Sequence, residues 1–77
     1  MKKYIATFYS NFGALSYSKV LKNQGIEAKL APVPRKASSS CGTCVYYEHI
    51  SAIDLNGCEL DSIYSETNGA LDCVLRK

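Results

Sequence analysis

The strongest constraint on this fold is a change of periodicity, from strand to helix and back to strand, within the N-terminal half of the chain. Residues Lys3 to Tyr9 alternate and are rich in aromatic and β-branched side chains, which is typical of a strand. Ser10 or Asn11 then offers an N-cap, and the apolar face that follows predicts an amphipathic helix. That face consists of Ala14, Tyr17, Ser18 and Leu21, with Leu15 and Val20 beside it.

The end of this helix and the next strand are marked by glycine and proline. Gly25 supplies the left-handed residue that commonly ends a helix, and Lys22 suits the negative end of the helix dipole. Ile26 to Ala31 then has the character of a second strand. Pro32 and Pro34 close it, because proline has no N–H to donate to a ladder.

The second half of the chain predicts a strand, a short helix and a hairpin. Thr43 to Glu48 has strong strand propensity. His49 to Leu55 predicts a short second helix, because Ile50 and Ile53 are spaced as a helical face before the stop at Asn56-Gly57. The last two strands are expected at Glu59 to Glu66 and Ala70 to Leu75, joined by a type I′ turn at Asn68-Gly69.

This order of elements predicts an α+β fold, a ferredoxin-like β-α-β-β-α-β sandwich with a shortened second helix and a C-terminal hairpin. We expect a single domain over residues 1–77. If the first two strands run the same way, the loop after the second lies at the end of the sheet where the first helix begins. Cys41 would then be close to the amide-rich segment formed by Asn11, Phe12 and Gly13.

The segment Pro34–Cys44, PRKASSSCGTC, carries the most specific chemical pattern. A cysteine reacts as its thiolate, and nearby cations, hydroxyl donors and backbone amides favour that anion. Such groups would also suit a persulfide or selenide anion on Cys41, and Cys44 could release the cargo by forming a disulfide. The cargo-binding groups expected here are Arg35 with Lys36, Ser38, Ser39, Ser40, and Gly42, which lets amides converge on an anion.

Three other interpretations of this loop compete with a carrier site. Cys41 and Cys44 could form a thiol-disulfide redox pair, because their Cys-x-x-Cys spacing suits one. They could instead begin a zinc site of a small binding module, completed from His49, Cys58 or Cys73, although a second Cys-x-x-Cys is lacking. The serines could also form an ordinary solvated loop in which both cysteines only fill space.

Charge and hydropathy limit the classes of partner that we expect for this chain. The net charge is only +2 and the cations are scattered, so nucleic-acid binding is not expected. No apolar run reaches the roughly 18 residues that span a bilayer, so we expect no membrane insertion. Four cysteines without an export signal predict the reducing cytoplasm. An exposed sheet edge in so small a domain makes a homodimer plausible.

The motif Pro34-Arg35-Lys36-Ala37-Ser38-Ser39-Ser40-Cys41-Gly42 resembles the selenium/sulfur carrier-like (Se/S carrier protein-like) family of small bacterial and archaeal proteins. The similarity covers most of Lys3 to Tyr64. It includes the opening strand, the helix with Ala14-Leu15 and Leu21, the Gly25-Ile26 junction, the strand ending at Ala31–Arg35, and Ile63-Tyr64.

This resemblance implies a cytosolic carrier of reduced sulfur or selenium, rather than an enzyme, with the cargo on Cys41 and with Arg35, Ser39 and Gly42 at matching motif positions. Its partners would be sulfur or selenium donor and acceptor proteins, and no cofactor or metal is expected. The chain departs from the family where His49 to Asn56 is too short for the usual second helix. Its tail, Asn68 to Lys77, looks like an addition.

Overall fold

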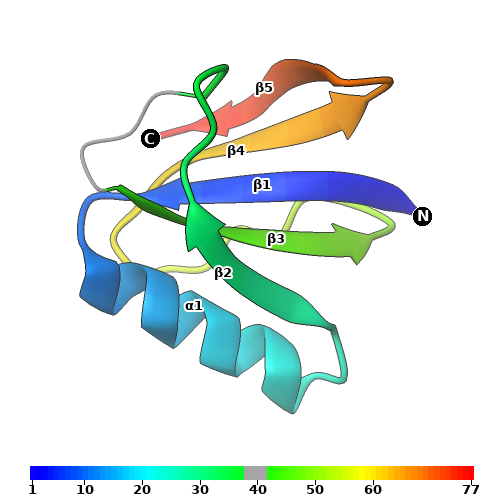
Figure 1. Ribbon diagram of the computed structural model, residues 1–77. Helices are drawn as coiled ribbons and strands as arrows, with labels where there is room; N and C mark the ends of the chain where they lie inside the picture. Colours follow the sequence, from blue (N-terminus) through cyan, green and yellow to red (C-terminus); the bar gives the residue numbers. More distant parts are fainter. Residues whose placement is uncertain (38–41) are drawn as a thin grey trace.

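A computed structural model of the protein describes residues 1–37 and 42–77 (Figure 1). The described residues form one helix and five strands, which makes the fold a small α+β domain. The elements are β1 (Lys2–Phe8), α1 (Asn11–Asn23), β2 (Ala28–Pro32), β3 (Thr43–His49), β4 (Leu60–Thr67) and β5 (Ala70–Arg76). The helix α1 is too short to cross a membrane.

The five strands form one sheet in the order β2-β3-β1-β4-β5, in which every neighbouring pair is antiparallel. Because β3 lies between β1 and β2 and opposes both, β1 and β2 run in the same direction, which meets the condition for the expected place of the loop between β2 and β3. Thr43 pairs with Pro32, and Cys44 pairs with Thr7 near the end of β1. Both ends of the β2–β3 loop therefore lie at the end of the sheet where the chain enters α1 (Figure 1).

Both ends of α1 carry the predicted caps. The Ser10 hydroxyl accepts a hydrogen bond from the Gly13 N–H at 3.2 Å. At the other end Gly25 has a φ of 78°, its N–H bonds to the Lys22 carbonyl, and the Ile26 N–H bonds to the Leu21 carbonyl at 2.9 Å. These two bonds define a Schellman motif, which satisfies the last carbonyls of the helix.

The predicted apolar face of α1 is buried, and it covers one face of the sheet. Its buried residues are Gly13, Ala14, Tyr17, Ser18 and Leu21. Opposite them lies the main core, formed by alternate residues of the central strands: Tyr4, Ala6, Phe8, Val45, Tyr47, Leu60 and Ile63. The rings of Phe8 and Tyr17 meet edge to face at 5.1 Å between centroids.

The predicted second helix at His49 to Leu55 is wrong: His49 ends β3, and residues 50–59 form turns and extended chain. Two tyrosine hydroxyls account for this. Tyr17 Oη lies 2.7 Å from the Ile53 carbonyl oxygen, and the Ile53 N–H donates to Tyr47 Oη at 3.1 Å. Because side chains from α1 and β3 satisfy the backbone of Ile53, this segment packs against the core without helical hydrogen bonds.

The predicted C-terminal hairpin is confirmed. Asn68 and Gly69 have φ values of 53° and 83°, and a type I′ turn needs positive φ at both central residues. β5 adds to β4 with a register shift between Ile63 and Tyr64. The fold is thus a five-stranded antiparallel sheet with one helix, in place of the predicted two-helix sandwich.

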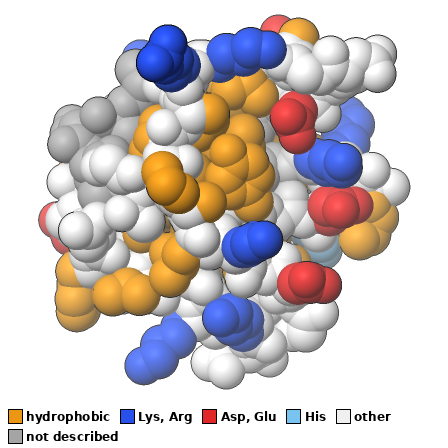
Figure 2. Space-filling view, viewed as in Figure 1, with side chains coloured by type: hydrophobic (Ala, Val, Ile, Leu, Met, Phe, Trp, Pro, Cys, Tyr) orange, Lys and Arg blue, Asp and Glu red, His pale blue; other side chains and the backbone are white. Residues whose placement is uncertain are grey.

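The sheet face away from α1 has its own smaller cluster, which the chain after β2 covers. Ile5, Cys44 and Tyr64 pack there with Ala37. Figure 1 shows this chain rising from β2 across the front of the sheet toward the β4–β5 hairpin. The Lys36 ammonium donates a hydrogen bond to the Gly69 carbonyl in that hairpin. In the same view, Figure 2 shows apolar side chains in the middle and charged side chains around them.

Candidate functional site

The candidate site is the loop between β2 and β3. Its base is closed by a hydrogen bond from the Val33 N–H to the Gly42 carbonyl at 3.0 Å. Ser38, Ser39, Ser40 and Cys41 lie outside the described residues. The predicted closeness of Cys41 to the start of α1 therefore stays a prediction, although the two ends of the loop lie at that end of the sheet.

The described cationic and glycine positions of the loop are open to solvent. Arg35 and Gly42 are exposed, and a side-chain carbon added to Gly42 would meet no atom within 4 Å. Lys36 is also exposed, but its ammonium is directed to the Gly69 carbonyl of the hairpin. Of the two expected cations, Lys36 is thus the one that contacts the C-terminal hairpin.

Cys44 is fully buried on the sheet face away from α1, with 0% of its surface exposed. It packs against Ile5, Ala37 and Tyr64, and its sulfur lies 3.5 Å from the Pro32 carbonyl oxygen. Neighbouring Tyr46 has a raised pKa, first because of burial and then because of the nearby Cys44 thiol. Its neighbours therefore shield the Cys44 sulfur from solvent.

The candidate zinc ligands do not gather among the described residues. Cys58 belongs to the core on the α1 side, whereas Cys44 belongs to the opposite face. His49 is five residues from Cys44 along β3, a distance of about 16 Å. Cys73 is exposed on β5, and burial raises the pKa of the Cys58 thiol, which disfavours the thiolate that binds zinc. Within residues 1–37 and 42–77 no three metal-binding side chains form a cluster.

The start of α1 holds a carboxylate that the sequence analysis missed. The Ser10 hydroxyl donates to Glu59 Oε1 at 2.5 Å, and the Tyr9 N–H donates to the Glu59 carbonyl at 2.9 Å. Glu59 has a left-handed φ of 53°. An added carbon at Gly13 would lie 2.0 Å from the Cys58 carbonyl oxygen, so only glycine allows this approach. The sequence signal for this close approach was Gly13 itself, because glycine is unusual in the first turn of a helix.

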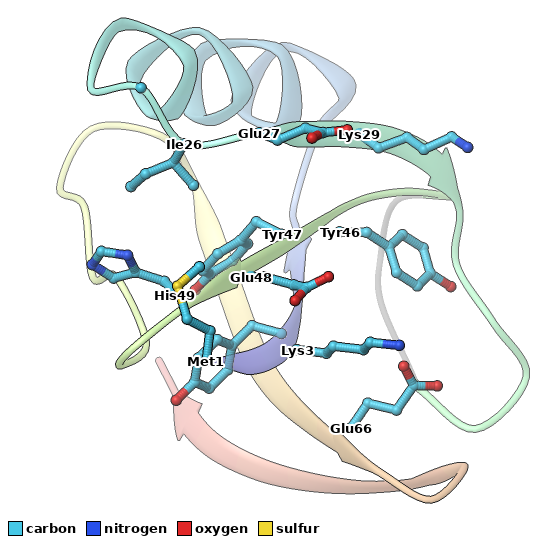
Figure 3. A pocket seen from close by; sticks show the side chains of 12 residues that line it. Met1, Lys3, Ile26, Glu27, Lys29, Tyr46, Tyr47, Glu48, His49 and Glu66 are labelled. Carbon is cyan, nitrogen blue, oxygen red and sulfur yellow. The ribbon is translucent and has the colours of Figure 1, made fainter.

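A second feature missed from sequence is a groove of about 700 Å³ at the far end of the sheet (Figure 3). Figure 3 shows Lys3 between Glu48 and Glu66, the residues that oppose it on β3 and β4. Glu48 is four residues from Cys44 along β3, which corresponds to about 13 Å. The lining of the groove also includes Tyr46, which packs against the cluster around Cys44.

Comparison with known proteins places the chain among carrier-like proteins. The family model described as "Putative Se/S carrier protein-like" matches residues 3–64. The uncharacterized protein YtiA of Escherichia coli (strain K12) is 27% identical over 79 aligned positions, which cover 96% of this chain and 91% of that protein. No solved structure matches the chain. Because the family model covers most of the sequence, the chain belongs to this Se/S carrier protein-like family.

Proposed function

We propose that this protein carries reduced sulfur or selenium in the cytosol as a persulfide or selenide on Cys41. The observation that carries the proposal is the sequence of this loop, in which Cys41 follows three serines and precedes Gly42, together with the exposure of Arg35 and Gly42, within the part of the chain that the family model matches. Hydroxyls, amides and a guanidinium are the groups that stabilise a sulfur or selenium anion.

For sulfur, the loading step is an exchange at a donor persulfide. The Cys41 thiolate attacks the outer sulfur of a donor R–S–SH. A bond forms between Cys41 and that sulfur, the S–S bond of the donor breaks, and the R–S⁻ thiolate leaves. An acceptor thiolate then removes the same sulfur from Cys41 in the reverse sense, which restores the Cys41 thiolate. Neither step needs an external oxidant or reductant, because the sulfur changes only its carrier.

The buried position of Cys44 favours direct transfer to an acceptor over release through a Cys41–Cys44 disulfide. Release by Cys44 would expel HS⁻ and leave a disulfide, which a dithiol reductant would have to reduce before the next cycle. Under direct transfer, Cys44→Ala retains repeated loading and unloading. Under the disulfide route, or in a thiol-disulfide redox protein, the variant loses turnover.

The proposal is tested by mass spectrometry after incubation with a cysteine desulfurase and either cysteine or selenocysteine, so that the donor is a persulfide or its selenium analogue R–S–SeH and the same exchange applies to both. We expect a mass gain of one sulfur or selenium atom on Cys41, absent in Cys41→Ser. Cys73→Ser is the matched control, because Cys73 is the exposed cysteine on β5 and would report non-specific labelling. A native protein without an adduct, or an adduct that persists in Cys41→Ser, would refute the proposal.

A further inference from the structure

The outer edge of β2 presents backbone groups that no strand of the described chain pairs with, because β2 is the last strand of the sheet. The Val33 N–H bonds to Gly42 across the ladder. In an antiparallel ladder alternate residues face the partner strand, so Ala31 and Lys29 also face β3. Ala28 and Leu30 consequently direct their N–H and C=O groups outward, whereas the Pro32 C=O accepts a hydrogen bond from the Cys44 sulfur.

Apolar side chains accompany this edge. Leu30 pairs with Val45 and so lies on the α1 side of the sheet, yet 38% of it is exposed. Gly13 of α1 faces Cys58, and Leu15 lies about 200° further round the helix, on the side away from Cys58. Leu15 is 53% exposed. An extended segment along β2 would cover Leu30 and form backbone hydrogen bonds at the same time.

We propose that this segment is β2 of a second copy, paired antiparallel about a twofold axis at Leu30. Leu30 of each copy then exchanges N–H and C=O bonds with Leu30 of the other. Ala28 of each copy lies opposite Pro32 of the other, so the missing N–H of proline falls at the ends of the ladder. The two sheets become continuous, and both α1 helices lie on one face.

The charge of Lys29 favours a twofold axis at Leu30 over one shifted by a residue to Lys29. An axis through Lys29 would place the two Lys29 side chains directly opposite each other, and like charges opposite one another destabilise a strand pair. The axis at Leu30 places Lys29 opposite Ala31 of the second copy. The same register brings Val33, where the cysteine loop begins, opposite Glu27, which lines the groove of the second copy.

The other edge strand, β5, is less suited to pairing. Its ladder with β4 has a register shift next to Tyr64, and it carries Asp72 and Arg76. Bulges and charges are features that protect sheet edges from association. Val74, which is 48% exposed on β5, therefore provides a matched control for Leu30.

The test is sedimentation velocity of the full chain over a range of concentrations. We expect a concentration-dependent dimer whose dissociation constant rises about tenfold or more in Leu30→Lys and is unchanged in Val74→Lys. Circular dichroism checks that both variants keep the fold. A native chain that stays monomeric throughout, or a dimer that Val74→Lys weakens and Leu30→Lys does not, would overturn the proposal.

A second measurement fixes the register without relying on a disruptive variant. In a background with Cys41→Ser and Cys73→Ser, Leu30→Cys is expected to form a disulfide-linked dimer on mild oxidation. Hydrogen-bonded antiparallel pairs have Cα atoms about 5.5 Å apart, which suits a disulfide. Val74→Cys in the same background is the control and should stay uncross-linked. Equal cross-linking of both variants contradicts pairing through β2.

Discussion

At the scale of single residues, two tyrosine hydroxyls decide the path of residues 50–59. The hydroxyls of Tyr17 and Tyr47 lie 3.0 Å apart and together bind both backbone groups of Ile53. Burial, and then the hydrogen bond to Tyr47, raises the pKa of Tyr17 well above its usual value. Burial also raises the pKa of Tyr47, which the hydrogen bonds from Tyr17 and Ile53 partly offset.

These pKa shifts predict a loss of stability at alkaline pH. Because the folded protein holds the Tyr17 proton beyond the unfolded pKa of about 10, the contribution is complete below that pH and is lost as the pH rises above it. Tyr17→Phe should lower the free energy of unfolding by about 1–2 kcal/mol at neutral pH and flatten its decline above about pH 10. Urea denaturation at a series of pH values measures both effects. An unchanged slope in Tyr17→Phe contradicts this assignment.

Gly13 is the second residue whose identity the packing dictates. We predict that Gly13→Ala destabilises the protein by about 2–3 kcal/mol, because its new carbon would press on the Cys58 carbonyl. For a domain of this size the midpoint of thermal unfolding should fall by about 10 °C or more. Gly42→Ala is the control, since its surroundings are open, and should have little effect. Equal midpoints for the two variants would disprove the close approach.

At the scale of elements, the prediction from sequence succeeded where neighbouring residues carry the signal. The periodicity of β1 and α1, the cap at Ser10, the stop at Gly25 and the Asn68-Gly69 turn are local features, and all are confirmed. The second helix failed because residues distant in sequence bind Ile53. Glu59 at the start of α1 was missed for the same reason, since it is 49 positions from Ser10 in the sequence.

The carboxylate of Glu59 bears on the chemistry of the neighbouring loop. It occupies the positive end of α1 that was expected to favour the Cys41 thiolate. Glu59→Gln removes this negative charge, so we predict that the pKa of Cys41 falls, because a nearby anion disfavours the thiolate. The shift should grow at low salt.

This prediction is measured by the pH dependence of alkylation of Cys41 in a Cys73→Ser background. Glu66→Gln provides the matched control, because it removes the same charge at the far end of the sheet, beside the groove. A Cys41 pKa that is equal in Glu59→Gln and Glu66→Gln would show that the carboxylate at α1 does not reach the loop electrostatically.

At the scale of the whole molecule, the C-terminal strand completes the sheet. Lys77 joins several parts of the fold: its N–H bonds to the Asp61 carbonyl, its carbonyl accepts from Tyr9 Oη, and its ammonium lies 2.6 Å from Asp54. Leu75 of β5 packs against the main core, and Leu71 packs against the cluster around Cys44. This strand lies beyond residue 64, where the match to the family model ends.

We predict that ending the chain at Thr67 lowers the thermal midpoint strongly and promotes association, because β4 would become an uncovered edge. Lys77→Ala should be nearly neutral, since a surface ion pair contributes about 0–1 kcal/mol. Differential scanning calorimetry and light scattering compare the two variants. A shortened chain that melts at the native midpoint would mean that β5 is dispensable.

The hydrogen bond between Lys36 and Gly69 links the cysteine loop to the turn of the C-terminal hairpin. Lys36 belongs to the stem that leads to Cys41, while Gly69 belongs to a turn outside the family match. Mutations in the hairpin could therefore alter how far the thiol extends toward a donor while every cysteine and serine of the motif stays the same. The choice of partner would then depend on the sequence of the C-terminal hairpin as well as on the cysteine motif.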